Sequence, residues 1–150
     1  MKKLLLLASL TSVMIGCASV TPADKSKSDE AKKLAQPVDG TSVIYIYTDR
    51  NTDTVSANDV YVNNQCIGRL NQKSFAYVNV SPGLHQVGME SYQGINEIAV
   101  ETKANEITYI NAVSHAGFSY TPELVEAKDI EKAKTAIAKY PLVKFGACGK

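Results

Sequence analysis

From Ser42 onward the chain alternates between β-branched or aromatic runs and short clusters of turn residues, and this pattern restricts the fold more than any other feature. The run Val43-Ile44-Tyr45-Ile46-Tyr47 is almost continuously apolar, which is typical of a strand buried on both faces. Similar runs recur at short, fairly regular intervals, as in all-β sandwiches and barrels. We therefore expect a mainly β protein, an antiparallel β-sandwich of about seven strands connected as a meander.

Turn chemistry marks the ends of several expected strands. Asn63-Asn64-Gln65 lies between two strand-like runs, and because Asn tolerates a positive φ angle, a tight hairpin fits there. Gly68 in the second arm indicates a β-bulge or a close approach of another backbone segment. In Ser81-Pro82-Gly83, proline at the second position and glycine at the third fit a type II turn.

One amphipathic helix is expected near the C-terminus. Ile130, Ala133 and Ile137 recur at helical spacing, and Pro141 stops the helix at Tyr140. The apolar stripe is narrow and consists mostly of Ala and Ile. We expect it to pack on the sheet, since a helix lying on a membrane needs a stronger amphipathic pattern and a more basic polar face.

The first residues have the features of an export signal. Lys2 and Lys3 precede a short apolar run, residues 4–10, which is too short for a bilayer-spanning helix of about 20 residues. The sequence Met14-Ile15-Gly16-Cys17 resembles the lipobox of bacterial lipoproteins. This resemblance implies cleavage before Cys17 and lipidation of that cysteine. The alternative is an ordinary secretory leader followed by an unmodified cysteine.

The expected domain organisation follows from this leader. Residues 1–16 are a lipoprotein signal peptide, residues 17–41 a lipidated flexible tether rich in Lys, Ser, Asp, Ala and Pro, and residues 42–150 the β-sandwich domain with its C-terminal helix. Ala18 and Ser19 follow the cysteine, and similar lipoproteins without Asp in the second position are passed on to the outer membrane. The expected location is its periplasmic face, with a Gram-positive plasma membrane as the alternative.

Two segments, residues 59–70 and residues 77–85, resemble a small bacterial lipoprotein family known as a domain of unknown function. The resemblance covers residues 42–128. Its Pro82-Gly83 pair followed by His85 is also similar to PEGA-type β modules of envelope and surface proteins. The resemblance implies a β-sandwich, no known catalytic residue and no known cofactor.

The balance of charge argues against one class of partner. The chain has sixteen Lys and Arg residues and fifteen Asp and Glu residues, and removal of Lys2 and Lys3 with the leader leaves fourteen basic residues. The near-neutral mature chain has no concentrated basic face, so we expect no nucleic-acid partner. The expected partners are a membrane, through lipid on Cys17, and an envelope protein or glycan.

Two cysteines and two histidines are candidate site residues. Cys66 and Cys148 remain after Cys17 takes lipid, and an oxidising compartment allows a disulfide between them, with two unpaired thiols as the alternative. His85 and His115 suggest a metal pair or a Ser-His nucleophile. Neither has a ligand-spaced partner in its own element, and no catalytic motif is present. We expect no enzyme, no catalytic residue, no metal and no cofactor.

One acidic segment has part of the pattern of a calcium loop. Asp49, Asn51 and Asp53 are spaced as in its first half. Thr54 and Val60 stand where that loop needs Gly and Glu, so a solvated turn is the better interpretation.

Tyrosine is abundant, with eight residues and no tryptophan. The strand tyrosines are expected mostly in the core, but any that share an exposed face would form a contact surface for protein or glycan. They are Tyr45, Tyr47, Tyr61, Tyr77 and Tyr109.

Three functions remain open on the sequence. The first is a non-enzymatic binding or scaffold module on a lipid tether, facing the periplasm. The second is a periplasmic hydrolase or ligand-processing enzyme using His85 or His115, which requires a concave pocket with a second polar group in reach. The third is a structural tether to peptidoglycan through Lys150, by analogy with lipoproteins that are joined to the cell wall through a C-terminal lysine.

Overall fold

The computed structural model describes residues 20–49, 57–114 and 122–149. Within these ranges the chain forms eight β-strands and two helices. Their order and bounds are α1 (Lys25–Ala31), β1 (Ser42–Tyr47), β2 (Asn58–Val62), β3 (Gln65–Leu70), β4 (Phe75–Val80), β5 (Gly83–Ser91), β6 (Gly94–Thr102), β7 (Ile107–Ser114), β8 (Pro122–Glu126) and α2 (Ile130–Lys139). In these ranges no helix is long and apolar enough to cross a membrane.

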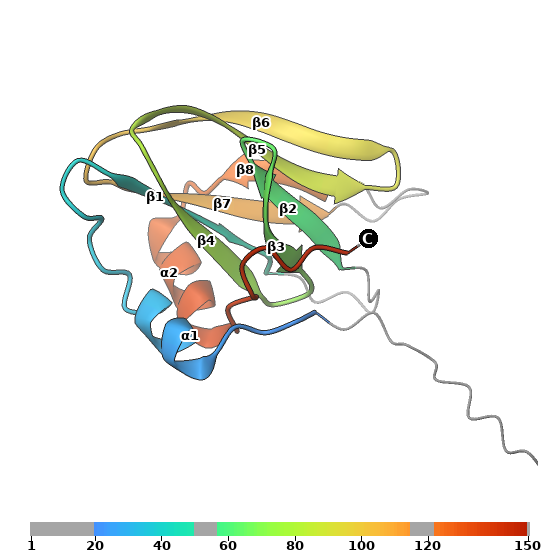
Figure 1. The fold of residues 1–150 in the computed structure, drawn as a ribbon, viewed down its shortest axis with the longest axis horizontal. Helices are drawn as coiled ribbons and strands as arrows, with labels where there is room; N and C mark the ends of the chain where they lie inside the picture. The colour runs from blue at the N-terminus through green and yellow to red at the C-terminus, as the bar shows by residue number, and fades with distance from the viewer. Residues whose placement is uncertain (1–19, 50–56, 115–121, 150) are drawn as a thin grey trace, which may run out of the picture.

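The strands form two four-stranded sheets that pack face to face (Figure 1). The first sheet has the order β4-β1-β7-β8 and the second has the order β3-β2-β5-β6. This arrangement confirms the expected mainly β sandwich with a C-terminal helix. The expected meander is wrong: β1 is a central strand that pairs with β4 and, in parallel, with β7, while its neighbour in sequence, β2, lies in the other sheet.

All six residues of β1 are buried, as the almost continuously apolar run predicts. Ile44 and Ile46 point into the space between the sheets, where they join the larger hydrophobic core. Tyr45 and Tyr47 belong to a second cluster on the opposite face of the first sheet, together with residues of both helices. The fold therefore has three layers, with the helices on one outer face of the first sheet and the second sheet on the other (Figure 1).

The hairpin between β2 and β3 has the expected turn. Asn63 and Asn64 have φ angles of 50° and 63°, which are the values of a type I′ turn. The register between β2 and β3 shifts at Ile67, next to Gly68. A Cβ atom on Gly68 would lie 2.6 Å from Cγ2 of Val143 and 3.3 Å from the backbone oxygen of Lys144. Both expectations for Gly68, a bulge and a close approach of another segment, are confirmed.

Helix α2 lies where the sequence predicts it. Asp129 caps its first turn by accepting a hydrogen bond of 2.9 Å from the backbone N–H of Lys132. The helix ends at Lys139, before the extended residue Tyr140 and Pro141. It packs on the first sheet through its buried residues, which are Ala133, Ala136 and Ile137.

The expected flexible tether over residues 17–41 is wrong for its described part, residues 20–41. Helix α1 docks on the first sheet, where Ser28 and Ala31 are buried. The Tyr45 hydroxyl donates a hydrogen bond of 2.8 Å to the backbone carbonyl of Ala31. The helix lacks a stripe of large apolar residues, but the sheet supplies aromatic side chains, and small residues let the helix approach them. The domain thus begins before residue 42, while Cys17 lies outside the described residues.

Replacing Ala31 by Lys will lower the free energy of unfolding by about 2 kcal/mol or more, because a long charged side chain has no room or water beneath α1. Ala35→Lys is the matched control, since Ala35 is exposed in the same segment and its replacement should change stability by less than about 0.5 kcal/mol. Urea titration measures both. Equal effects of the two variants would show that α1 does not dock.

Candidate binding groove beside strand β4

Several residues singled out in the sequence lie outside the described ranges, namely Cys17, His115, Lys150 and most of the calcium-like segment. Asp49, the first residue of that segment, is described. It accepts a hydrogen bond from the Tyr140 hydroxyl, and its carboxylate lies 3.6 Å from Nζ of Lys132. Asp49 therefore connects the end of β1 to helix α2. Within the described ranges, no three side chains of His, Cys, Asp or Glu gather as metal ligands would.

His85 is buried, and both of its ring nitrogens have hydrogen-bond partners. Nε2 lies 2.8 Å from the carbonyl oxygen of Ser81, and because a carbonyl only accepts, Nε2 carries the proton. Nδ1 then accepts from the side-chain amide of Asn63 at 2.9 Å. The oxygen of that amide in turn accepts from the backbone N–H of Gln86 at 3.1 Å. In this arrangement His85 joins the β2–β3 hairpin to the turn before β5.

Cys66 of β3 and Cys148 of the C-terminal tail form a disulfide, with a Cα–Cα distance of 6.3 Å. The tail is held at a second point by Asp59, which is only 1% exposed and accepts a hydrogen bond of 3.1 Å from the backbone N–H of Gly149. The guanidinium of Arg69 lies 3.6 Å from the same carboxylate oxygen. Of the two alternatives for the cysteines, the structure contains the disulfide, which fixes the tail on the second sheet.

Before it reaches that disulfide, the C-terminal segment runs along the start of β4. Phe75 donates its backbone N–H to the carbonyl of Pro141 at 3.1 Å, and its own carbonyl accepts from the N–H of Val143 at 2.9 Å. On its other side the segment pairs with the N-terminal residues, since Lys144 donates to the carbonyl of Thr21 at 2.9 Å. The N-terminal residues and the segment after Pro141 therefore meet at the edge of the first sheet.

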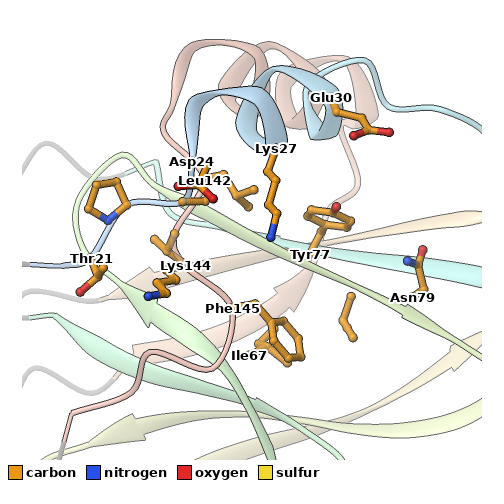
Figure 2. A pocket seen from close by; sticks show the side chains of 14 residues that line it. Thr21, Asp24, Lys27, Glu30, Ile67, Tyr77, Asn79, Leu142, Lys144 and Phe145 are labelled. Atoms are coloured by element: carbon orange, nitrogen blue, oxygen red, sulfur yellow. The ribbon is translucent and has the colours of Figure 1, made fainter.

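A groove of about 830 Å³ opens at this meeting point (Figure 2). Its walls come from four segments distant in sequence: the N-terminal residues with α1, the edge strand β4, Ile67 of β3, and the segment after Pro141. The lining residues are Thr21, Pro22, Ala23, Asp24, Lys27, Glu30, Ile67, Tyr77, Val78, Asn79, Leu142, Val143, Lys144 and Phe145.

The two sides of the groove differ in chemistry. Asp24, Lys27 and Glu30 of the α1 segment border one side, and in Figure 2 the side chain of Lys27 extends from the helix toward Tyr77. The other side is lined by Ile67 and Phe145 (Figure 2), and Phe145 is 54% exposed. The groove thus offers charged groups along one wall and apolar surface along the other.

The sequence did not indicate this groove. Its apolar wall comes from the short run Leu142-Val143-Lys144-Phe145 after Pro141, which is too short to be assigned from periodicity. Its charged wall belongs to the segment expected as a tether. The groove exists only because tertiary packing brings the N-terminal residues and the segment after Pro141 to β4.

Three of the five strand tyrosines, Tyr45, Tyr47 and Tyr109, are buried in the core. The ring of Tyr45 stacks on those of Tyr77 and Tyr109, with centroid distances of 5.4 and 5.9 Å. Burial, followed by the neighbouring phenols, raises the pKa of Tyr45. Tyr47 is also buried, and Tyr61 is half-buried. Tyr77 is half-buried as well and lines the groove.

Loss of the disulfide in a Cys148→Ser variant will lower the free energy of unfolding by roughly 4 to 5 kcal/mol, because the bond closes a long loop and restricts the unfolded chain. Urea titration under non-reducing conditions measures this change. A reducing agent should lower the stability of the native protein to that of the variant and leave the variant unchanged. A native protein that is insensitive to reduction would contradict the prediction.

The hydrogen bond to Asp49, followed by burial, raises the pKa of Tyr140 to about 12. Between pH 10 and 12 the unfolded chain therefore loses this proton while the folded protein keeps it, and folding stability falls. Tyr140→Phe should cost about 1 kcal/mol below pH 10, and this cost should shrink as the pH rises toward 12. Urea titrations at pH 9 and pH 11 measure it. Tyr92→Phe, at a 99% exposed position, should change stability at neither pH.

Comparison with known proteins covers nearly the whole chain. A protein of Haemophilus influenzae described as "Uncharacterized protein" is 27% identical over 141 residues, which cover 92% of this chain and 84% of the relative. No solved structure matches the chain. The expectation of a family of unknown function is confirmed, while lipid attachment and likeness to PEGA modules stay predictions. The family described as Protein of unknown function (DUF2846) matches residues 38–121, more than half of the chain, and the chain belongs to this family.

Proposed function

We propose that this protein is a non-enzymatic binding module, attached by lipid on Cys17 to the periplasmic face of the outer membrane. The observation that carries the proposal is the groove beside β4. Its volume of about 830 Å³ falls within the range of ligand-holding pockets, roughly 300 to 1,000 Å³. It combines an apolar wall with a few charged groups, as binding sites commonly do. The partner is an envelope component, protein or glycan.

The proposed location is supported by the N-terminal export signal and by the disulfide. Disulfides persist in oxidising compartments such as the periplasm, so the Cys66–Cys148 bond fits an exported protein. A diacylglycerol together with a third acyl chain on Cys17 would give stable attachment, whereas one chain alone gives marginal binding. The family resemblance noted from the sequence also implies a lipoprotein.

The docked N-terminal segment would hold the groove close to the membrane. Thr21, which lines the groove, is four residues after Cys17, and an extended chain covers at most about 3.6 Å per residue. The lipid-bearing cysteine is therefore no more than roughly 15 Å from the groove wall along the chain. A groove at this distance suits a partner that lies on the same membrane.

The enzyme alternative has less support from the described residues. A histidine that acts as a catalytic base needs a free ring nitrogen next to a substrate pocket. The ring nitrogens of His85 are both hydrogen-bonded within the fold, and His85 does not line the groove. His115 lies outside the described residues. The peptidoglycan alternative depends on Lys150, which also lies outside them.

Replacing Cys17 by Ala should abolish lipid attachment and release the protein from the outer-membrane fraction, because the remaining leader is too short to span a bilayer. Intact mass and fractionation of native and variant proteins measure both effects. Cys148→Ser is the control for general damage at a cysteine, and it should keep the lipid. A native protein without lipid would refute the proposed attachment to the outer membrane.

The binding part is tested separately by site-specific photo-crosslinking in cells. A photoreactive phenylalanine analogue at Phe145, in the groove, should yield a discrete crosslinked product. The same analogue at Leu84, which is 71% exposed on the second sheet, serves as the control and should not. Equal crosslinking at both positions would refute a specific role for the groove.

A further inference from the structure

We infer that the groove takes an extended peptide segment, which pairs with the free edge of β4 at Tyr77 and Asn79 as an added strand. This inference rests on the proposed binding function and names the class of partner as a polypeptide in β conformation. An extended peptide binds in this way through its own backbone N–H and C=O groups, while its alternate side chains supply selectivity.

The backbone N–H and C=O groups along β4 point alternately toward β1 and away from it. Ser74, immediately before β4, accepts a hydrogen bond of 3.0 Å from the N–H of Thr48, so its backbone faces β1. Phe75 faces the opposite way, toward Pro141 and Val143. Because these directions alternate along a strand, the N–H and C=O groups of Tyr77 and Asn79 also point away from β1.

These outward groups have no backbone partner in the parts of the chain that the structure describes. β4 is the edge strand of the first sheet, and Tyr77 and Asn79 both line the groove. An edge strand with unpaired N–H and C=O groups is a template for another extended chain. The groups of Tyr77 and Asn79 are two residues apart, which matches the repeat of a strand and not that of a helix.

The C-terminal segment of the chain pairs with the start of the β4 edge and then turns away from it. Leu142 forms a parallel bridge with Phe75, so the C-terminal segment already occupies the first position along the edge. After Val143 the chain turns away: the N–H of Ala147 bonds the carbonyl of Lys144 at 3.2 Å, and Gly146 has a φ angle of 71°. The disulfide then holds Cys148 on β3. The next positions along β4 are therefore left for a strand from another chain.

The walls of the groove indicate the side chains that such a strand would carry. On a β-strand, successive side chains point to opposite faces of the sheet. On one face the added strand would meet Lys27 and the phenol of Tyr77, and on the other it would meet Ile67 and Phe145 (Figure 2). The favoured peptide alternates polar and apolar residues, with an apolar side chain toward Phe145 and a polar one toward the wall of Asp24, Lys27 and Glu30.

The same walls favour a single peptide over a second copy of this protein. Pairing of two β4 edges would require two whole sandwiches to approach along the edge. Helix α1 borders the groove on one side and Phe145 on the other. A lone strand fits between these walls more readily than a second folded domain.

The test uses the native, disulfide-bonded protein and a displayed library of random dodecapeptides. An enriched peptide is then synthesised in a series in which each residue in turn is N-methylated, which removes one backbone N–H. Strand addition predicts that methylation at alternate residues weakens binding about tenfold or more, while methylation at the residues between has little effect. This measurement does not depend on any variant of the protein.

A matched pair of variants tests the protein side. Asn79→Pro removes the outward N–H of Asn79, together with its side chain in the groove, and should weaken peptide binding about tenfold. Glu126→Pro is the control on the opposite edge of the same sheet. Its neighbour Ala127 donates its N–H to the carbonyl of Tyr109, so the N–H of Glu126 points outward as well. Glu126→Pro should bind within about twofold of the native protein, and thermal unfolding shows whether both variants fold.

Three outcomes would overturn the inference. The first is that no peptide is enriched, and the second is that methylation has no alternating effect. The third is concentration-dependent dimerisation that Asn79→Pro abolishes, which would assign the edge to a second copy. The proposed binding function would still stand in each case if the crosslink from Phe145 persists, and it would fail on its own if that crosslink is absent.

Discussion

The burial of β1 on both faces is the constraint on which the rest of the structure depends. Its apolar side chains point alternately to the two sides of the first sheet, so each side needs a cover. The second sheet covers Ile44 and Ile46, and the two helices cover Tyr45 and Tyr47. A two-layer sandwich would leave three stacked tyrosine rings, those of Tyr45, Tyr77 and Tyr109, exposed to water. The third layer follows from that requirement.

This requirement also explains why a segment with the composition of a linker folds against the domain. The first sheet provides the large tyrosine side chains under the helices. Helix α1 therefore needs only small residues where it contacts the sheet. Ser28 and Ala31 meet this need, and the Tyr45 hydroxyl satisfies the carbonyl of Ala31 at the end of the helix. Docking of α1 places the N-terminal residues against the segment after Pro141. The groove beside β4 is a consequence of covering the tyrosine face.

The disulfide determines how much of the β4 edge stays accessible. It draws the C-terminal tail onto the second sheet after only a short contact with β4. The buried carboxylate of Asp59 holds the same tail through the N–H of Gly149. Edge strands are usually protected from pairing, and here the protection covers Phe75 and stops. Because only the start of β4 is covered, a short stretch of its edge stays free. In the proposed function, this stretch is the place where a short peptide near the membrane would bind.

The sequence by itself determined the features that depend on neighbouring residues. Side-chain periodicity predicted the strand of residues 43–47 and helix α2. The tolerance of Asn for positive φ predicted the turn at Asn63-Asn64, and the missing N–H of proline predicted the end of α2 before Pro141. A glycine within a strand indicates either a β-bulge or a close approach of another backbone segment, and the structure has both at Gly68. Only the tertiary structure decided the parallel pairing of β1 with β7, the docking of α1, the pairing of Cys66 with Cys148 and the groove. Each of these depends on contacts between segments far apart in the chain, and no local pattern specifies which distant surface a segment will meet.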